Sequence, residues 1–117
     1  MSTNKKKLIF PTKLKILENV YKIKYIDGTI EHPDGDDVEG WVDFITNTIH
    51  VNCKPEFVTV WNTIFHEVGH VLVEELRLPL NEKQEEMIMN LIGMGMTSVI
   101  FDNKLKFDFR KMRKLDE

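Results

Sequence analysis

Residues 55 to 78 read PEFVTVWNTIFHEVGHVLVEELRL, the longest helical pattern in the chain. Its apolar side chains recur at every third or fourth position, which is the spacing of one face of a helix. Pro55 suits the first turn of a helix, where its missing N–H costs nothing, and Pro79 ends the pattern. Residues 66 to 70 of this predicted helix read His-Glu-Val-Gly-His. Two histidines therefore lie one helical turn apart, with a glutamate directly after the first.

This spacing of histidines favours a metal site. Residues four apart share one face of a helix, so His66 and His70 can hold one Zn²⁺ together. Glu67 lies beside them and can act as the general base towards a water molecule on that ion. Gly69 removes side-chain bulk where another element or a substrate approaches closely. Without a metal, two histidines and a glutamate within an apolar helix would be costly polar burials. The motif therefore predicts zinc as the cofactor and Glu67 as the catalytic residue.

A third protein ligand is needed, because catalytic zinc keeps three protein ligands and one open position. A second helix is predicted from its N-cap Asn81 to about residue 103, and its opening turns carry Glu85 and Glu86. Glu85 borders the apolar stripe of this helix, whereas Glu86 points further towards the polar side. Glu85 is therefore the predicted ligand, and Glu86 stays open as the alternative. Both acids also suit a helix N-terminus with no metal at all. The stripe consists of Ile88, Leu91, Ile92, Gly95 and Val99.

The rest of the chain predicts strands before the two helices. Residues 13–26 are rich in β-favouring side chains, and residues 41–45 and 48–52 form a hairpin pattern. Residues 31–39 carry Pro, Gly and several acids, which is typical of an exposed loop. The predicted fold class is α+β, with a small antiparallel sheet packed on two main helices. The whole chain, 1–117, is expected to be a single domain whose core spans about 13–103, followed by a charged tail, 104–117.

Composition limits the partners and the compartment. The formal net charge of −3 gives no global attraction to nucleic acid or to an anionic membrane. The longest apolar stretch, residues 87–101, is shorter than the ~20 residues that a membrane span needs. Cys53 is the only cysteine, so no internal disulfide is possible and a reducing compartment is expected. We therefore expect a cytoplasmic protein with neither a nucleic-acid nor a membrane partner.

Three segments together resemble a known family. Residues 40–43 (GWVD), 48–52 (TIHVN) and 63–70 (TIFHEVGH) are similar to the ImmA/IrrE-type zincin-like metallopeptidases. The later stretch, from residues 85–88 (EEMI) to 99–103 (VIFDN), resembles the small phage-encoded members of that family. The resemblance covers roughly residues 38–103, and Met89-Asn90 is the nearest approach to the Ala-Asn pair that follows the family's glutamate. It implies a minimal zincin-like domain of bacterial or phage origin. It also implies a glutamate on the second helix, at 85 or 86, as the third ligand.

Three functions fit these observations. The first is a zinc-dependent metalloendopeptidase whose protein or peptide substrate adds a strand to the hairpin beside the metal helix. The second is a zinc-binding regulatory or interaction protein that keeps the fold without turnover. The third is a metal-free structural module. The substrate and the oligomeric state stay open.

The other two histidines are expected outside this site. His32 lies in the acidic loop and is expected at the surface. His50 lies between Ile49 and Val51 in a strand, so it points outward if those two face the core.

Overall fold

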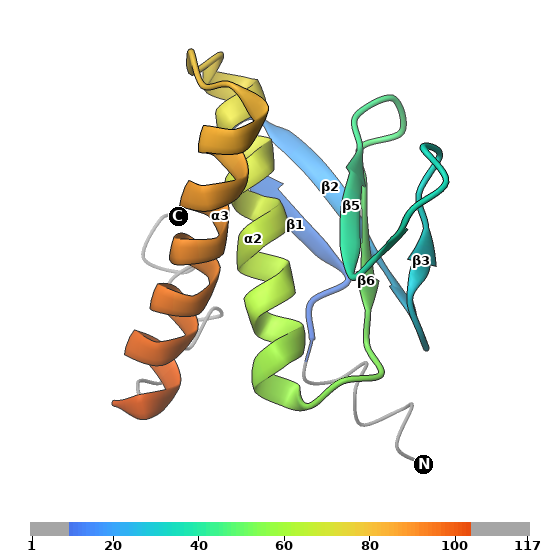
Figure 1. Ribbon diagram of the computed structural model, residues 1–117, viewed down its shortest axis with the longest axis vertical. Helices are drawn as coiled ribbons and strands as arrows, with labels where there is room; N and C mark the ends of the chain where they lie inside the picture. Colours follow the sequence, from blue (N-terminus) through green and yellow to red (C-terminus); the bar gives the residue numbers. More distant parts are fainter. Residues whose placement is uncertain (1–9, 104–117) are drawn as a thin grey trace, which may run out of the picture.

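The computed structural model describes residues 10–103, and Figure 1 shows two long helices on one side of a small sheet. α2 lies between α3 and the sheet, while the β3–β4 pair lies at the other end of the molecule (Figure 1). This arrangement confirms the α+β class. No helix among the described residues is long and apolar enough to cross a membrane. The elements in chain order are β1 (Lys13–Ile16), β2 (Asn19–Ile26), β3 (Ile30–Glu31), β4 (Asp37–Val38), β5 (Gly40–Asp43), β6 (Thr48–Asn52), α2 (Phe57–Leu76), α3 (Glu82–Thr97) and the π-helical turn η1 (Ser98–Asp102).

The main sheet has the strand order β1-β2-β6-β5, which makes β5 an edge strand. β1 pairs antiparallel with β2, and β5 pairs antiparallel with β6, but β2 and β6 are parallel. The sheet is therefore mixed, and the expected purely antiparallel sheet was wrong. Residues 27–47 connect β2 to β6 and contain the three short strands β3, β4 and β5. The chain reverses direction between β5 and β6, so β6 runs in the same direction as β2.

Residues 31–39 are more ordered than the sequence predicts. β3 and β4 form a separate two-stranded antiparallel sheet, with Ile30 opposite Val38 and Glu31 opposite Asp37. The loop prediction was therefore wrong at both ends of this segment. Ile30 is buried, which supplies the apolar contact that a two-stranded sheet needs for stability.

The core lies between α2 and the sheet. Ile49 and Val51 of β6 are fully buried, and His50 between them faces the other side of the sheet, as predicted. Tyr21 is almost fully buried, and its hydroxyl donates a 2.7 Å hydrogen bond to Glu75 of α2. This bond fastens the C-terminal half of α2 to the sheet. The buried core cluster comprises Phe10, Ile16, Tyr21, Ile23, Ile49, Val51, Val60, Ile64 and Val71.

Local signals set the ends of both helices. Arg77 ends α2 in the left-handed conformation, at φ 52°, and its N–H donates back to carbonyls of the last turn. Asn81 caps α3 as predicted, because its side chain accepts from the backbone N–H of Gln84. The Gln84 side chain accepts in turn from the backbone N–H of Asn81, which completes a capping box. The capped turn places the acids of α3 beside the middle of α2.

α3 packs on α2 through a face that differs from the predicted one. Its buried residues are Met89, Gly93 and Thr97, at intervals of four. A Cβ atom at Gly93 would lie 2.8 Å from the backbone oxygen of Asn62, so the helices meet closely there. The predicted stripe was wrong, because close contact selects small residues in place of large apolar ones. Its large members are exposed instead: Ile88, Leu91, Ile92 and Val99.

Two glycines of α3 provide a test of this orientation. Gly93→Ala should lower the free energy of unfolding by about 1–3 kcal/mol, because the added methyl meets backbone that cannot move aside. Gly95 faces open space, so Gly95→Ala should raise the same free energy by about 0.5–1 kcal/mol. Urea unfolding of both variants measures this difference. If both variants changed the free energy of unfolding by the same amount, the packing of α3 on α2 through Gly93 would be contradicted.

Candidate metal centre

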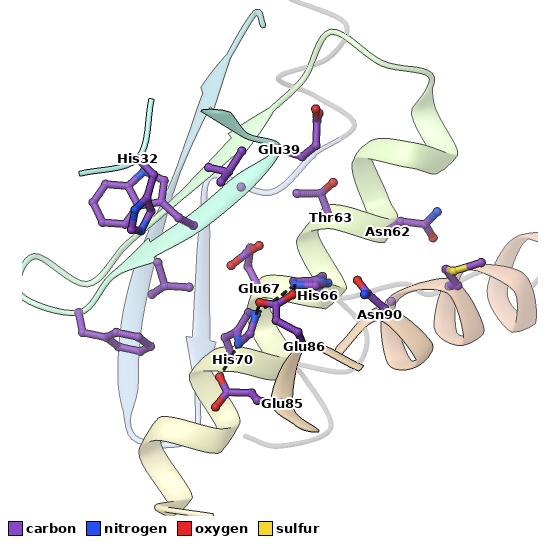
Figure 2. Close-up of a pocket in the computed structure, with 17 residues that line it drawn as sticks. His32, Glu39, Asn62, Thr63, His66, Glu67, His70, Glu85, Glu86 and Asn90 are labelled. Atoms are coloured by element: carbon purple, nitrogen blue, oxygen red, sulfur yellow. Dashed lines mark hydrogen bonds and ion pairs between the residues drawn. The ribbon is translucent and has the colours of Figure 1, made fainter. Parts of the chain in front are cut away.

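Three side chains from the two helices converge on one point (Figure 2). His66 and His70 of α2 approach each other through their Nε2 atoms, which lie 3.0 Å apart. Glu86 of α3 reaches both: one carboxylate oxygen lies 2.9 Å from Nε2 of His70 and the other 3.3 Å from Nε2 of His66. Among the described residues, His66, His70 and Glu86 form the group of donor atoms that could hold an ion.

These separations are compatible with a bound metal ion such as zinc. Nitrogen and oxygen ligands bound at about 2.0–2.1 Å in a tetrahedral arrangement lie about 3.3 Å from one another. The two Nε2 atoms and the carboxylate oxygens of Glu86 are separated by 2.9–3.3 Å. Two imidazoles and a carboxylate are also a donor set that zinc prefers, whereas Mg²⁺ and Ca²⁺ prefer oxygen alone. The residues present therefore fit the expected cofactor.

Glu85, the predicted third ligand, lies outside the donor group and contacts the other nitrogen of the His70 ring. Its carboxylate oxygen lies 2.5 Å from Nδ1 of His70, on the opposite side of the ring from Glu86. In the tautomer that carries the proton on Nδ1, His70 donates to Glu85 and its Nε2 lone pair is free for a metal. The group of donor atoms thus contains the alternative, Glu86, while Glu85 orients His70.

Glu67 lies beside the donor group but is not part of it. Only 5% of its surface is exposed, and Figure 2 shows its carboxylate on the side of the histidines that faces β5. Burial raises the pKa of this carboxyl to about 7, with His70 opposing the shift. A divalent cation nearby would favour the anionic form and lower that pKa again. A carboxylate here can accept a proton from a water molecule at the donor group.

Asn90 is a site residue that the motif alone did not indicate. Burial lowers the pKa of His66, as does neighbouring His70. Glu86 and a hydrogen bond that the His66 ring donates to the Asn90 side chain raise the same pKa. Asn90 follows Glu86 by one helical turn, so both project from the same face of α3. The four-residue spacing of Glu86 and Asn90 was therefore a signal in the sequence for this site. It favours Glu86 over Glu85 as the third ligand.

The donor group opens into a cleft of about 570 Å³ between α2, α3 and β5. Trp41 of β5 forms part of its wall, stacked on His50 with ring centroids 4.7 Å apart. His32 packs edge-on against the same indole and lines the cleft, so it is not the plain surface residue that we expected. The acidic side chains along the cleft are Glu39, Glu67, Glu85 and Glu86.

Two glycines allow the close approaches that build the cleft. A Cβ atom at Gly69 would collide with Sδ of Met89, so this glycine of the motif allows α3 to approach α2 closely. A Cβ atom at Gly40 would lie 2.7 Å from the Thr63 side chain and 3.1 Å from Oε2 of Glu67. Gly40 therefore lets the edge strand pass directly over the metal helix.

Comparisons of the chain with known proteins find no match, either among protein-family models, among curated proteins or among solved structures. The likeness to the ImmA/IrrE-type metallopeptidases therefore depends on the motif residues alone. Function is argued below from the geometry of the site.

Proposed function

We propose that this protein is a zinc-dependent metallopeptidase. The observation that carries the proposal is the convergence of His66, His70 and Glu86 at the base of a cleft, with the buried Glu67 beside them. A bound zinc ion would supply Lewis-acid activation of water and of a peptide carbonyl. Two imidazoles and a carboxylate also suit iron(II), so metal analysis of purified protein is the first test.

Each residue of the site has a part in this mechanism. His66, His70 and Glu86 would hold the ion, and Glu85 would fix the ring of His70 through Nδ1. Glu67 would take the proton from the attacking water and deliver it to the leaving nitrogen. These proton transfers need no movement of the backbone, because α2 already carries Glu67 next to the donor atoms.

The edge strand β5 would bind the substrate backbone. β5 ends the sheet and lines the cleft, so its outer edge offers N–H and C=O groups to an extended peptide. A protein or peptide is therefore the proposed substrate. We propose the bacterial or phage-infected cytoplasm as its place of action, in keeping with the single cysteine and the resemblance described above.

A second function is supported by the length of β5. The strand has only four residues, so it can pair with a short stretch of peptide only. A zinc-binding regulatory protein would keep the site and bind a partner without cleaving it. Incubation of the zinc-loaded protein with a peptide library separates the two functions. Cleavage supports the peptidase, whereas binding without products supports the regulatory protein.

The two neighbouring glutamates of α3 test the ligand assignment. Glu86→Gln should weaken zinc binding by more than ~100-fold, whereas Glu85→Gln should weaken it by ~10–100-fold, as is usual for a partner of a ligand. Competition with a zinc-binding dye measures both values. Glu82→Gln, in the exposed first turn of α3, is the matched control and should bind as wild type does. A larger loss for Glu85→Gln would assign the third ligand to Glu85.

A further inference from the structure

The outer face of α3 carries an apolar stripe. Its most exposed member is Leu91, with 68% of its surface accessible. Residues 87–101 contain no charged side chain, so nothing in the sequence makes this face hydrophilic. A helix face of this kind on a folded protein marks a contact surface. In the structure the exposed apolar stripe comprises Met87, Ile88, Leu91 and Ile92 of α3 together with Val99 of η1, all between 37% and 68% exposed.

This stripe points away from the rest of the described structure. At 100° per residue it lies opposite Met89, Gly93 and Thr97, the residues that α3 buries. α2 separates α3 from the sheet, so the sheet does not reach the stripe (Figure 1). The metal centre, on the α2 side of the same helix, stays outside it. The stripe and the cleft are therefore separate surfaces.

We propose that the stripe binds a second copy of this chain through an antiparallel α3–α3 contact about a two-fold axis. A two-fold axis that crosses the helix near position 93 brings residue 91 of each chain opposite residue 95 of the other. Leu91 is the most prominent side chain of the stripe, and a Cβ atom at Gly95 would meet no atom within 4 Å. The Leu91 side chain of each copy thus fits over Gly95 of the other copy, and the two-fold axis repeats this contact.

The charges of α3 favour this antiparallel arrangement. Glu82, Glu85 and Glu86 lie in the first two turns of the helix. A parallel pair would bring these acids of both chains together, whereas an antiparallel pair separates them. It also places the positive N-terminal end of each helix beside the negative C-terminal end of the other.

The size of the stripe sets the expected strength of the dimer. The five side chains expose on the order of 400 Å² per chain, so two copies would bury on the order of 800 Å² of apolar surface, together with a polar rim. Stable specific interfaces bury about 1,200–2,000 Å² in total, so the apolar part of this contact falls below that range and is typical of a weak interface. We therefore expect a weak, reversible dimer, with a dissociation constant on the order of 10 μM.

Sedimentation equilibrium of the full chain between 2 and 200 μM tests the proposal. The wild type should pass from monomer to dimer over this range, and Leu91→Glu should raise the dissociation constant at least ~30-fold by placing a charge in the contact. Ile45→Glu is the matched control, because Ile45 is 97% exposed in the β5–β6 turn, and it should dimerise as the wild type does. A wild type that stays monomeric at 200 μM would overturn the proposal, as would unchanged dimerisation of Leu91→Glu.

Two further variants test the register and the competing occupant. Gly95→Leu should raise the dissociation constant ~10-fold, because it fills the space that receives Leu91, and unchanged affinity would reject the two-fold axis near position 93. Circular dichroism of each variant is the control for correct folding. If residues 104–117 covered the stripe instead, the wild type would be monomeric, and Phe107→Ser with Phe109→Ser would induce self-association. That result would also overturn the proposal.

Discussion

Glu67→Gln is expected to lower the rate of peptide hydrolysis by at least ~100-fold while leaving zinc content unchanged. Glu67 is buried beside the donor group and contributes no atom to it. Glutamine has nearly the same shape but cannot accept a proton from water at neutral pH. The variant should therefore fold, bind zinc and bind substrate. Steady-state cleavage of a substrate peptide, paired with metal analysis of the same sample, measures the effect.

The control for this prediction comes from the same helix. Glu74 is exposed near the C-terminal end of α2, so Glu74→Gln changes the charge equally without touching the cleft. It should retain wild-type turnover. Cleavage by Glu67→Gln at the wild-type rate would reject the proposed general base. Loss of zinc from Glu67→Gln would show instead that this residue contributes to metal binding.

His70→Ala is expected to weaken zinc binding by well over ~100-fold, which is beyond the usual effect of changing a residue that only orients a ligand. His70 has two contacts at the site, because its Nε2 lies 2.9 Å from Glu86 and its Nδ1 lies 2.5 Å from Glu85. Removing the ring deletes a donor atom and leaves Glu85 without its partner. Isothermal titration with zinc, after removal of bound metal, measures the loss.

His50→Ala is the matched control for this change. His50 lies on β6, stacked on Trp41, and is not part of the donor group. Its replacement should leave zinc affinity within a few-fold of wild type. One zinc per chain retained at wild-type affinity in both His66→Ala and His70→Ala would reject the metal centre. If a histidine variant loses both zinc and helical structure, its zinc loss does not test the ligand assignment. The test is then Glu86→Gln, because glutamine preserves the size of the side chain.

The sequence contained enough to predict the helix α2 and the fold class. Periodicity and the two prolines located α2 to within about two residues at each end, at Phe57–Leu76. Asn81 located the start of α3, because its cap is a local interaction that needs no knowledge of the rest of the fold. His66 and His70 share a face by helix geometry alone. All of these inferences depend on residues close together in the chain.

The orientation of α3 could not be predicted in the same way. A hydrophobic stripe is usually the buried face of a helix, but here the helices approach too closely for large side chains at the point of contact. Gly93 and Thr97 carry little hydrophobic signal, so the pattern indicated the opposite face. The predicted phase favoured Glu85 as the third ligand, whereas the donor group in the structure contains Glu86. The parallel pairing of β2 with β6 was missed because strand direction depends on contacts distant in sequence.

The parallel pairing of β2 with β6 has a consequence for the order of folding. β1 with β2, β5 with β6, and α2 with α3 are each joined by a short connection, so little chain entropy is lost when each pair forms. Pairing β2 with β6 requires closure of the loop of residues 27–47, which makes it the slow, non-local step. Every donor atom of the metal centre lies after that loop. We therefore expect the ligands to assemble within one continuous stretch of chain, and the N-terminal hairpin to dock afterwards and complete the core.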